Sequence, residues 1–77
     1  MVFYVSGEVN KPDAYKLEEN LTVRKTTTKA GGFSGHASKN IARIIRKSNG
    51  REQFFDKIEM NAPILQEDVI LVPESIF

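Results

Sequence analysis

Four basic residues lie close together in the second half of the chain, on either side of an Asn-Gly pair. They are Arg43, Arg46, Lys47 and Arg51. Guanidinium and ammonium groups bind carboxylates and phosphates through charge-assisted hydrogen bonds. A hairpin with simply solvated charges is the alternative interpretation. The pattern makes these four residues candidate ligand-binding groups for an acidic partner.

Two tyrosines are the other candidate binding residues. Tyr4 and Tyr15 fall in two segments that are expected to pair as a hairpin, where they could be neighbours. Exposed tyrosine rings could stack on sugar rings, whereas packing in the core or at a sheet edge is the alternative. Together with the four basic residues, they complete the predicted ligand-binding set.

Residues for catalysis or metal binding are scarce. The chain has no cysteine and a single histidine, His36, in a Gly/Ser loop, which leaves no nucleophile–base pair and a poor start for a metal site. Gly31-Gly32 does not match a phosphate-binding loop and fits a helix end instead. The acidic pairs at 18–19 and 67–68 are interpreted as solvated turns. We therefore expect a protein that is not an enzyme and uses no cofactor or metal.

Charge is unevenly distributed along the chain, although the formal net charge is only +1. Residues 24–51 hold eight basic and no acidic side chains, whereas residues 52–77 hold six acidic side chains and one basic one, Lys57. Solvated faces that happen to fall in blocks would explain this. The sharper hypothesis is a basic surface that meets an acidic ligand or an acidic neighbouring subunit.

These residues must be positioned by short elements. Thr22 can cap a helix that ends at Gly31-Gly32, although Thr26, Thr27 and Thr28 are weak helix formers. Asn49-Gly50 indicates a tight hairpin, and Phe54 and Phe55 should point to opposite faces of the strand that follows it. The expected order is a strand at 2–9, a turn at 10–13, a strand at 14–18, a helix at 23–30, a loop at 33–38, and strands at 41–47, 51–58 and 69–72.

Five strands and one helix in 77 residues predict a single α+β domain over residues 1–77, with one short helix packed on a mixed sheet. The last strand, Val69–Val72, is apolar on both faces, which favours a central position in the sheet, and we expect it beside the first strand. This arrangement is the ubiquitin-like β-grasp. The apolar runs Val2–Val5 and Val69–Val72 are four residues long, far short of the roughly 20 that a transmembrane helix needs, so the chain is expected to be soluble.

Several short motifs, in their order and spacing, resemble one family. They are Val5-Ser6-Gly7-Glu8-Val9, Lys11-Pro12, Tyr15, Leu21-Thr22-Val23, Ala30-Gly31-Gly32-Phe33, Ile44-Ile45-Arg46 and Asp68-Val69-Ile70-Leu71-Val72-Pro73-Glu74-Ser75. Over nearly its whole length the chain resembles an SLBB domain (soluble-ligand-binding β-grasp), in the variety found in bacterial polysaccharide biosynthesis and export proteins. It departs from the usual family pattern at Asp13 and Glu67, where the family has glycine, and at Thr27 and Lys29, where it has apolar residues.

The resemblance implies a function that the composition does not. Such parent proteins are periplasmic or outer-membrane lipoproteins of capsule or exopolysaccharide export, and their SLBB domains stack in the wall of a ring. The chain would then be one repeat of a longer protein, contributing to ring assembly and contacting polysaccharide, with an inner-membrane chain-length or export protein as a further partner. The alternative is a stand-alone module that binds a polyanion, either an acidic glycan or, more remotely, nucleic acid.

Overall fold

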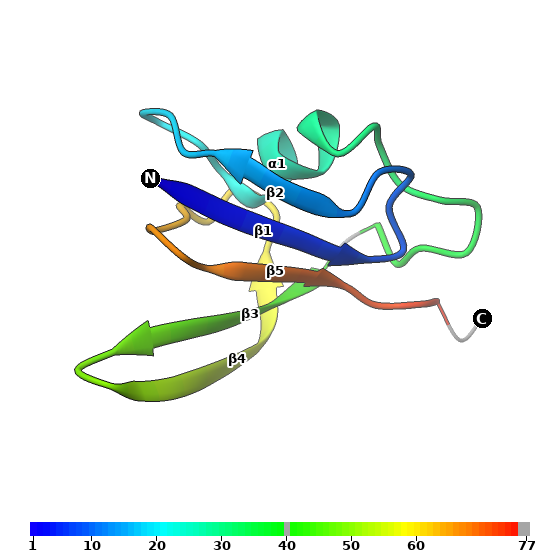
Figure 1. Cartoon of the computed structure of the whole chain (residues 1–77). Helices are drawn as coiled ribbons and strands as arrows, with labels where there is room; N and C mark the ends of the chain where they lie inside the picture. The colour runs from blue at the N-terminus through cyan, green and yellow to red at the C-terminus, as the bar shows by residue number, and fades with distance from the viewer. Residues whose placement is uncertain (40, 76–77) are drawn as a thin grey trace.

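The computed structural model describes residues 1–39 and 41–75; Asn40 and the last two residues of the predicted domain lie outside the described residues (Figure 1). A single helix and five strands follow one another in the predicted order within this part of the chain. They are β1 (Val2–Gly7), β2 (Asp13–Lys16), α1 (Val23–Lys29), β3 (Ile41–Ser48), β4 (Arg51–Glu59) and β5 (Val69–Val72). The α+β class predicted from the sequence is confirmed.

The strands form one mixed sheet in the order β2-β1-β5-β3-β4. β5 runs parallel to β1 and antiparallel to β3, and the two hairpins, β1–β2 and β3–β4, are antiparallel. The strand with apolar residues on both faces therefore lies in the centre, beside the first strand, as its composition predicted. Figure 1 shows β2 and β4 at the two edges of the sheet.

Gly7 permits the close approach of β1 and β5. Its φ is +89°, and a Cβ atom at this position would lie 2.3 Å from the carbonyl oxygen of Val72. Beyond it, the amide of Glu8 donates to that same carbonyl oxygen at 2.9 Å. A side chain would have to push β5 away, so only glycine fits the end of this parallel pair.

The helix begins and ends where the sequence predicted. The Thr22 hydroxyl accepts a hydrogen bond from the amide of Lys25 at 3.3 Å, and the amides of Val23 and Arg24 donate to the carbonyls of Ala62 and Met60. Those bonds satisfy first-turn amides that a helix leaves without internal partners. After α1, Gly31 and Gly32 both have positive φ, which ends the helix.

The threonines of α1 explain how so polar a helix packs on the core. Thr26 and Thr27 are buried, and their hydroxyls donate to the carbonyls of Val23 and Arg24 at 2.6 and 2.7 Å. Because each hydroxyl is satisfied within the helix, the buried threonines incur no penalty for an unpaired polar group.

The core lies on one face of the sheet. Alternate residues of the central strands are buried there, with α1 and the segment after β4 against them. The buried apolar residues are Phe3, Val5, Val9, Leu21, Val23, Ala30, Ala37, Ala42, Ile44, Met60, Ile64, Ile70 and Val72. We call this side the inner face and the opposite side, which carries the exposed Tyr4 and Phe54, the outer face. In the part of the chain that is described, no helix has the length and apolar character needed to cross a membrane.

The β3–β4 hairpin extends beyond the rest of the sheet. β3 pairs with β5 only over residues 43–45, whereas its pairing with β4 continues to Ser48 and Arg51. Asn49 and Gly50 have φ values of +53° and +77°, as the predicted Asn-Gly turn requires. A register shift between Ala42 and Ile44, with Lys57 at a φ of +58°, accompanies a bend in β4, and Figure 1 shows the hairpin tip away from β5.

Candidate binding surface

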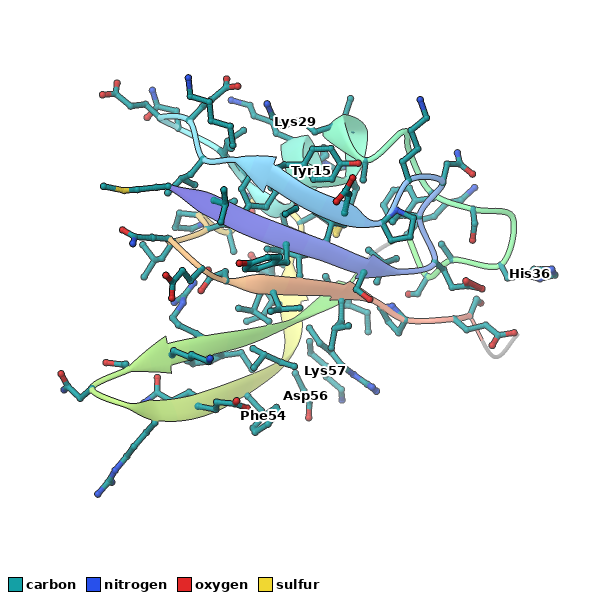
Figure 2. All side chains as sticks on the ribbon, in the orientation of Figure 1. Tyr15, Lys29, His36, Phe54, Asp56 and Lys57 are labelled. Carbon is teal, nitrogen blue, oxygen red and sulfur yellow. The ribbon has the colours of Figure 1, made fainter. Side chains whose placement is uncertain are left out.

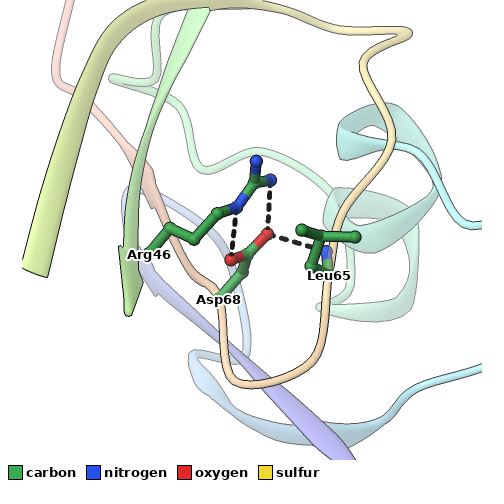
Figure 3. Close-up of polar contacts among 3 residues, drawn as sticks. All are labelled: Arg46, Leu65 and Asp68. Carbon is green, nitrogen blue, oxygen red and sulfur yellow. Dashed lines mark hydrogen bonds and ion pairs between the residues drawn. The ribbon is translucent and has the colours of Figure 1, made fainter. Parts of the chain in front are cut away.

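Arg46 is bonded to a buried carboxylate on the inner face. Its Nε and Nη2 donate to Oδ1 and Oδ2 of Asp68 at 2.9 and 2.8 Å, and the amide of Leu65 donates to Oδ2 at 2.7 Å (Figure 3). The Asp68 side chain is 0% exposed, so the prediction that the acidic pair at 67–68 forms a solvated turn is wrong for this residue. The sequence pattern missed it because the partner lies 22 residues away along the chain.

This contact ties the projecting hairpin to the loop before β5. The hydrogen bonds to Asp68 raise the pKa of Arg46, with burial acting in the opposite direction. The guanidinium carbon also lies 5.4 Å from the centre of the Phe55 ring, within reach of a cation–π contact. Arg46 therefore has a structural role here, whatever else it binds.

The other three basic candidates do not join Arg46 in one patch. Arg43 Nε lies 3.4 Å from Oδ1 of Asp56, and both side chains are well exposed. Lys47 lies opposite Glu52 in the hairpin, and Arg51 lies opposite Ser48. Strand alternation places Arg43 and Lys47 on the outer face and Arg46 and Arg51 on the opposite side. The four basic residues are close in sequence, but the sheet places two of them on each face.

The blocks of charge are partly paired within the chain. Arg46–Asp68 and Arg43–Asp56 each join a residue of the basic segment to one of the acidic segment. Lys29 binds Glu18 at 2.7 Å, and this bond lowers the pKa of Glu18. The separation of basic and acidic residues along the sequence therefore partly reflects ion pairs between neighbouring strands and loops of one chain, rather than between two molecules.

The two tyrosines lie on opposite faces of the sheet, so the expectation that they are neighbours across the hairpin is wrong. Tyr15 is opposite Phe3, with ring centroids 6.0 Å apart, and its hydroxyl donates to the carbonyl of Lys11. Tyr4 is opposite Ala14 and is 41% exposed. One position of difference in register reverses the face of a side chain.

On the outer face, Tyr4 begins a row of side chains that crosses the sheet. Register pairs it with Val69 of β5, which pairs with Ile45 of β3, which pairs with Phe54 of β4. Phe54 is 70% exposed, and Phe55 packs against the core, so the prediction that they point to opposite faces is confirmed. Tyr15 and Phe54 lie at opposite edges of the sheet (Figure 2).

Phe54 was not among the residues predicted to bind. The Asn-Gly turn already fixes Ile45 opposite Phe54, and this was the signal that could have identified an aromatic side chain on an open face. His36 is exposed in its loop, as expected. Among residues 1–39 and 41–75, no cluster of three or more His, Asp or Glu side chains could hold a metal ion.

The comparison with known proteins identifies a family. No curated protein matches the chain. The family model of the SLBB domain matches residues 2–56, from the start of β1 into β4, which is 55 of the 77 residues. SLBB domains are ligand-binding modules and are not known as catalysts. With the matched segment covering most of its length, the chain belongs to the SLBB domain family.

Proposed function

We propose that this chain is a non-enzymatic β-grasp module of a protein that exports polysaccharide across the bacterial outer membrane. Within that parent protein it contributes to a ring of identical subunits and contacts the polymer. The observation that carries the proposal is the SLBB match, taken with the sequence motifs up to Ser75 that resemble the export variety of the family.

The strand order supports the β-grasp assignment. The first and last strands are parallel neighbours in the middle of the sheet, and each end of the sheet is an antiparallel hairpin. The helix connects the two hairpins, following β2 and preceding β3. A helix on one face of such a mixed sheet is the layout expected from the sequence.

Ring assembly needs a head-to-tail interface, in which two different surfaces of one subunit meet. The sheet has two different free edges, β2 and β4, and two different faces. Charge supports this interface less than the sequence indicated, because Arg43 and Arg46 have partners within the chain. The basic residues to test are therefore Lys47 and Arg51, at the tip of the hairpin.

The proposal is tested in the source bacterium by deleting the gene and measuring polysaccharide at the cell surface and inside the cell. We expect the surface polymer to be lost while intracellular synthesis continues, and complementation by the intact gene to restore it. Surface polymer at the normal level in the deletion strain would contradict an export function.

The ring is tested separately with the double variant Lys47→Glu, Arg51→Glu in the parent protein. We expect smaller assemblies by analytical ultracentrifugation. The matched control is Arg24→Glu, Lys25→Glu, which reverses two exposed charges on α1 instead. Equal assembly sizes for both double variants would exclude the hairpin tip from the interface.

A further inference from the structure

The outer-face row has the composition of a stacking platform. Aromatic rings stand at Tyr4 and Phe54, with Val69 and Ile45 between them. Three strand spacings of about 4.8 Å separate the backbone positions of the two aromatic residues, so the row is roughly 14 Å long. It is long enough for a chain of several rings rather than one small molecule.

The platform is held in place before any ligand arrives. Ile45 and Phe54 lie in the paired part of the hairpin, next to Arg46, whose two hydrogen bonds to Asp68 fix that hairpin to the loop before β5. Tyr4 lies on the parallel β1–β5 pair at the centre of the sheet. Binding to such a surface loses little conformational entropy.

Charged side chains of both signs border the Phe54 end of the row. Two residues away along the strands, Arg43 and Asp56 lie on one side, and Lys47 and Glu52 lie on the other. All four are exposed. Each of these two pairs therefore offers hydrogen-bond donors and acceptors beside the apolar row, and each pair has no net charge.

We propose that the outer face binds a glycan chain laid across the strands, with sugar rings stacked on Tyr4 and Phe54 and sugar hydroxyls bonded to the bordering charged side chains. The apolar C–H face of a sugar ring suits an aromatic ring, and its hydroxyls both donate and accept. The glycan is recognised by its ring faces and hydroxyls rather than by its charge. This inference rests on the proposed function only for the source of the glycan.

The charged borders and the size of the row favour a glycan over other occupants. A second sheet packed on this face would have to bury Arg43, Asp56 and their counterparts, which is costly for charges taken out of water. The apolar row also consists of only four residues, whereas a standard protein interface takes roughly 20–30 residues from each partner. A polyanion would face the carboxylates of Glu52 and Asp56.

The test is calorimetric titration of the 77-residue chain with oligosaccharides prepared from the surface polysaccharide of the source bacterium. The variants are Phe54→Ala, the conservative Phe54→Tyr, and Leu65→Ala, which removes an exposed apolar side chain outside the row. Each titration is run at low and at high salt, and heparin oligosaccharides serve as the polyanion probe.

We expect saturable binding that changes little with salt. The loss of one stacking contact in Phe54→Ala should weaken it about tenfold, whereas Phe54→Tyr and Leu65→Ala should bind like the wild type. Absence of binding, or equal binding by Phe54→Ala, would overturn the inference. Heparin binding that falls steeply with salt, without binding of the source glycan, would replace it with a polyanion site.

The gene deletion separates this inference from the proposed function. If deletion abolishes surface polymer and Phe54→Ala binds glycan normally, only the stacking platform is wrong. If binding depends on Phe54 and the deletion strain exports polymer normally, the platform stands and the export function is wrong.

Discussion

The two faces of the sheet differ in which side chains they bury: the inner face buries a charged group, and the outer face exposes an aromatic ring. On the inner face, the carboxylate of Asp68 is fully buried, and it accepts two hydrogen bonds from Arg46 and one from the amide of Leu65. On the outer face, the ring of Phe54 is largely exposed, with charged residues beside it. The buried carboxylate with its hydrogen-bond partners in place stabilises the fold, whereas the row from Tyr4 to Phe54 leaves apolar surface in contact with solvent, mostly at its two aromatic ends.

Adjacent residues of β4 make the same contrast at short range. Phe55 packs against the core beneath the Arg46 guanidinium, while Phe54 points to the outer face. The two side chains are chemically identical and belong to one rigid strand. The direction of the side chain, and not its type, therefore decides which phenylalanine of β4 packs in the core and which one faces solvent.

Both faces depend on the close β1–β5 pair, so the largest effect is expected from Gly7→Ala. The new Cβ would meet the Val72 carbonyl at 2.3 Å in a backbone conformation with φ of +89°. We expect a loss of more than about 3 kcal/mol in the free energy of unfolding, from strain and displacement of β5, measured by urea denaturation.

Two other glycines provide matched controls for that substitution. In Gly50→Ala the new Cβ contacts no other atom, but the backbone keeps a positive φ, so the substitution should cost about 1 kcal/mol. In Gly35→Ala the new Cβ has no close contact and the backbone is not in the positive-φ region, so stability should change by less than about 0.5 kcal/mol. Equal losses for Gly7→Ala and Gly50→Ala would show that the contact with Val72 is unimportant.

Asp68→Ala tests the inner face and should cost about 3 kcal/mol. The substitution leaves Arg46 and the amide of Leu65 without their shared hydrogen-bond acceptor. Because Arg46 is partly exposed, the loss in the free energy of unfolding should be at the lower end of the range for broken buried ion pairs. The matched control is Asp56→Ala, whose pair with Arg43 is exposed and should contribute less than about 1 kcal/mol. Urea denaturation that gives the two variants the same stability would contradict a structural role for the Arg46–Asp68 pair.

The phenylalanine pair tests the contrast between faces within one strand. Phe55→Ala should lower the free energy of unfolding by about 2 kcal/mol, since it removes a partly buried ring from the core. Phe54→Ala should change it by less than about 0.5 kcal/mol, because the ring is mostly in water. Thermal unfolding of the two variants measures both losses of stability. A larger loss of stability for Phe54→Ala than for Phe55→Ala would reverse our assignment of the faces.

A small stabilisation is expected from Glu67→Gly. Glu67 has a φ of +65°, a conformation that disfavours residues with a Cβ by about 1 kcal/mol. The greater freedom of glycine in the unfolded chain offsets part of this gain, which leaves about 0.5 kcal/mol. Chemical denaturation should show a higher midpoint with an unchanged slope, and a lower midpoint would mean that the Glu67 side chain makes a stabilising contact.

The smallest effect concerns pH. The hydrogen bond from Lys29 lowers the pKa of Glu18 below its ordinary value, so the ionised carboxylate is favoured in the folded state. Its contribution is present above the unfolded-state pKa and is lost as pH falls through the folded-state pKa. Glu18→Gln should therefore reduce the difference in stability between neutral and acidic pH slightly, and an unchanged or larger difference would count against the pairing.

Elements with local signals were predictable from the sequence. Thr22 and Gly31-Gly32 fixed the ends of α1, Asn49-Gly50 fixed the β3–β4 turn, and the apolar run at 69–72 indicated the central strand. Each signal acts through residues that are close in sequence or through plain hydrophobicity. Local rules were therefore sufficient for most of the fold.

The contacts of the candidate site residues depend on register and on partners that are distant in sequence. The face of Tyr4 relative to Tyr15 changes with a single position of register, and the local pattern did not fix it. The burial of Asp68 depends on Arg46 from another strand, and two of the four basic candidates have partners within the chain. Three-dimensional pairing, rather than composition, assembled the row that ends at Phe54.

The most direct test of the binding face is an amide-resolved NMR titration of the isotope-labelled chain with oligosaccharides from the source bacterium. We expect saturable shifts at the outer-face row, at Tyr4, Val69, Ile45 and Phe54, with the amides of α1 unmoved. Shifts confined to the hairpin tip at residues 47–51, or to the loop around His36, would contradict it.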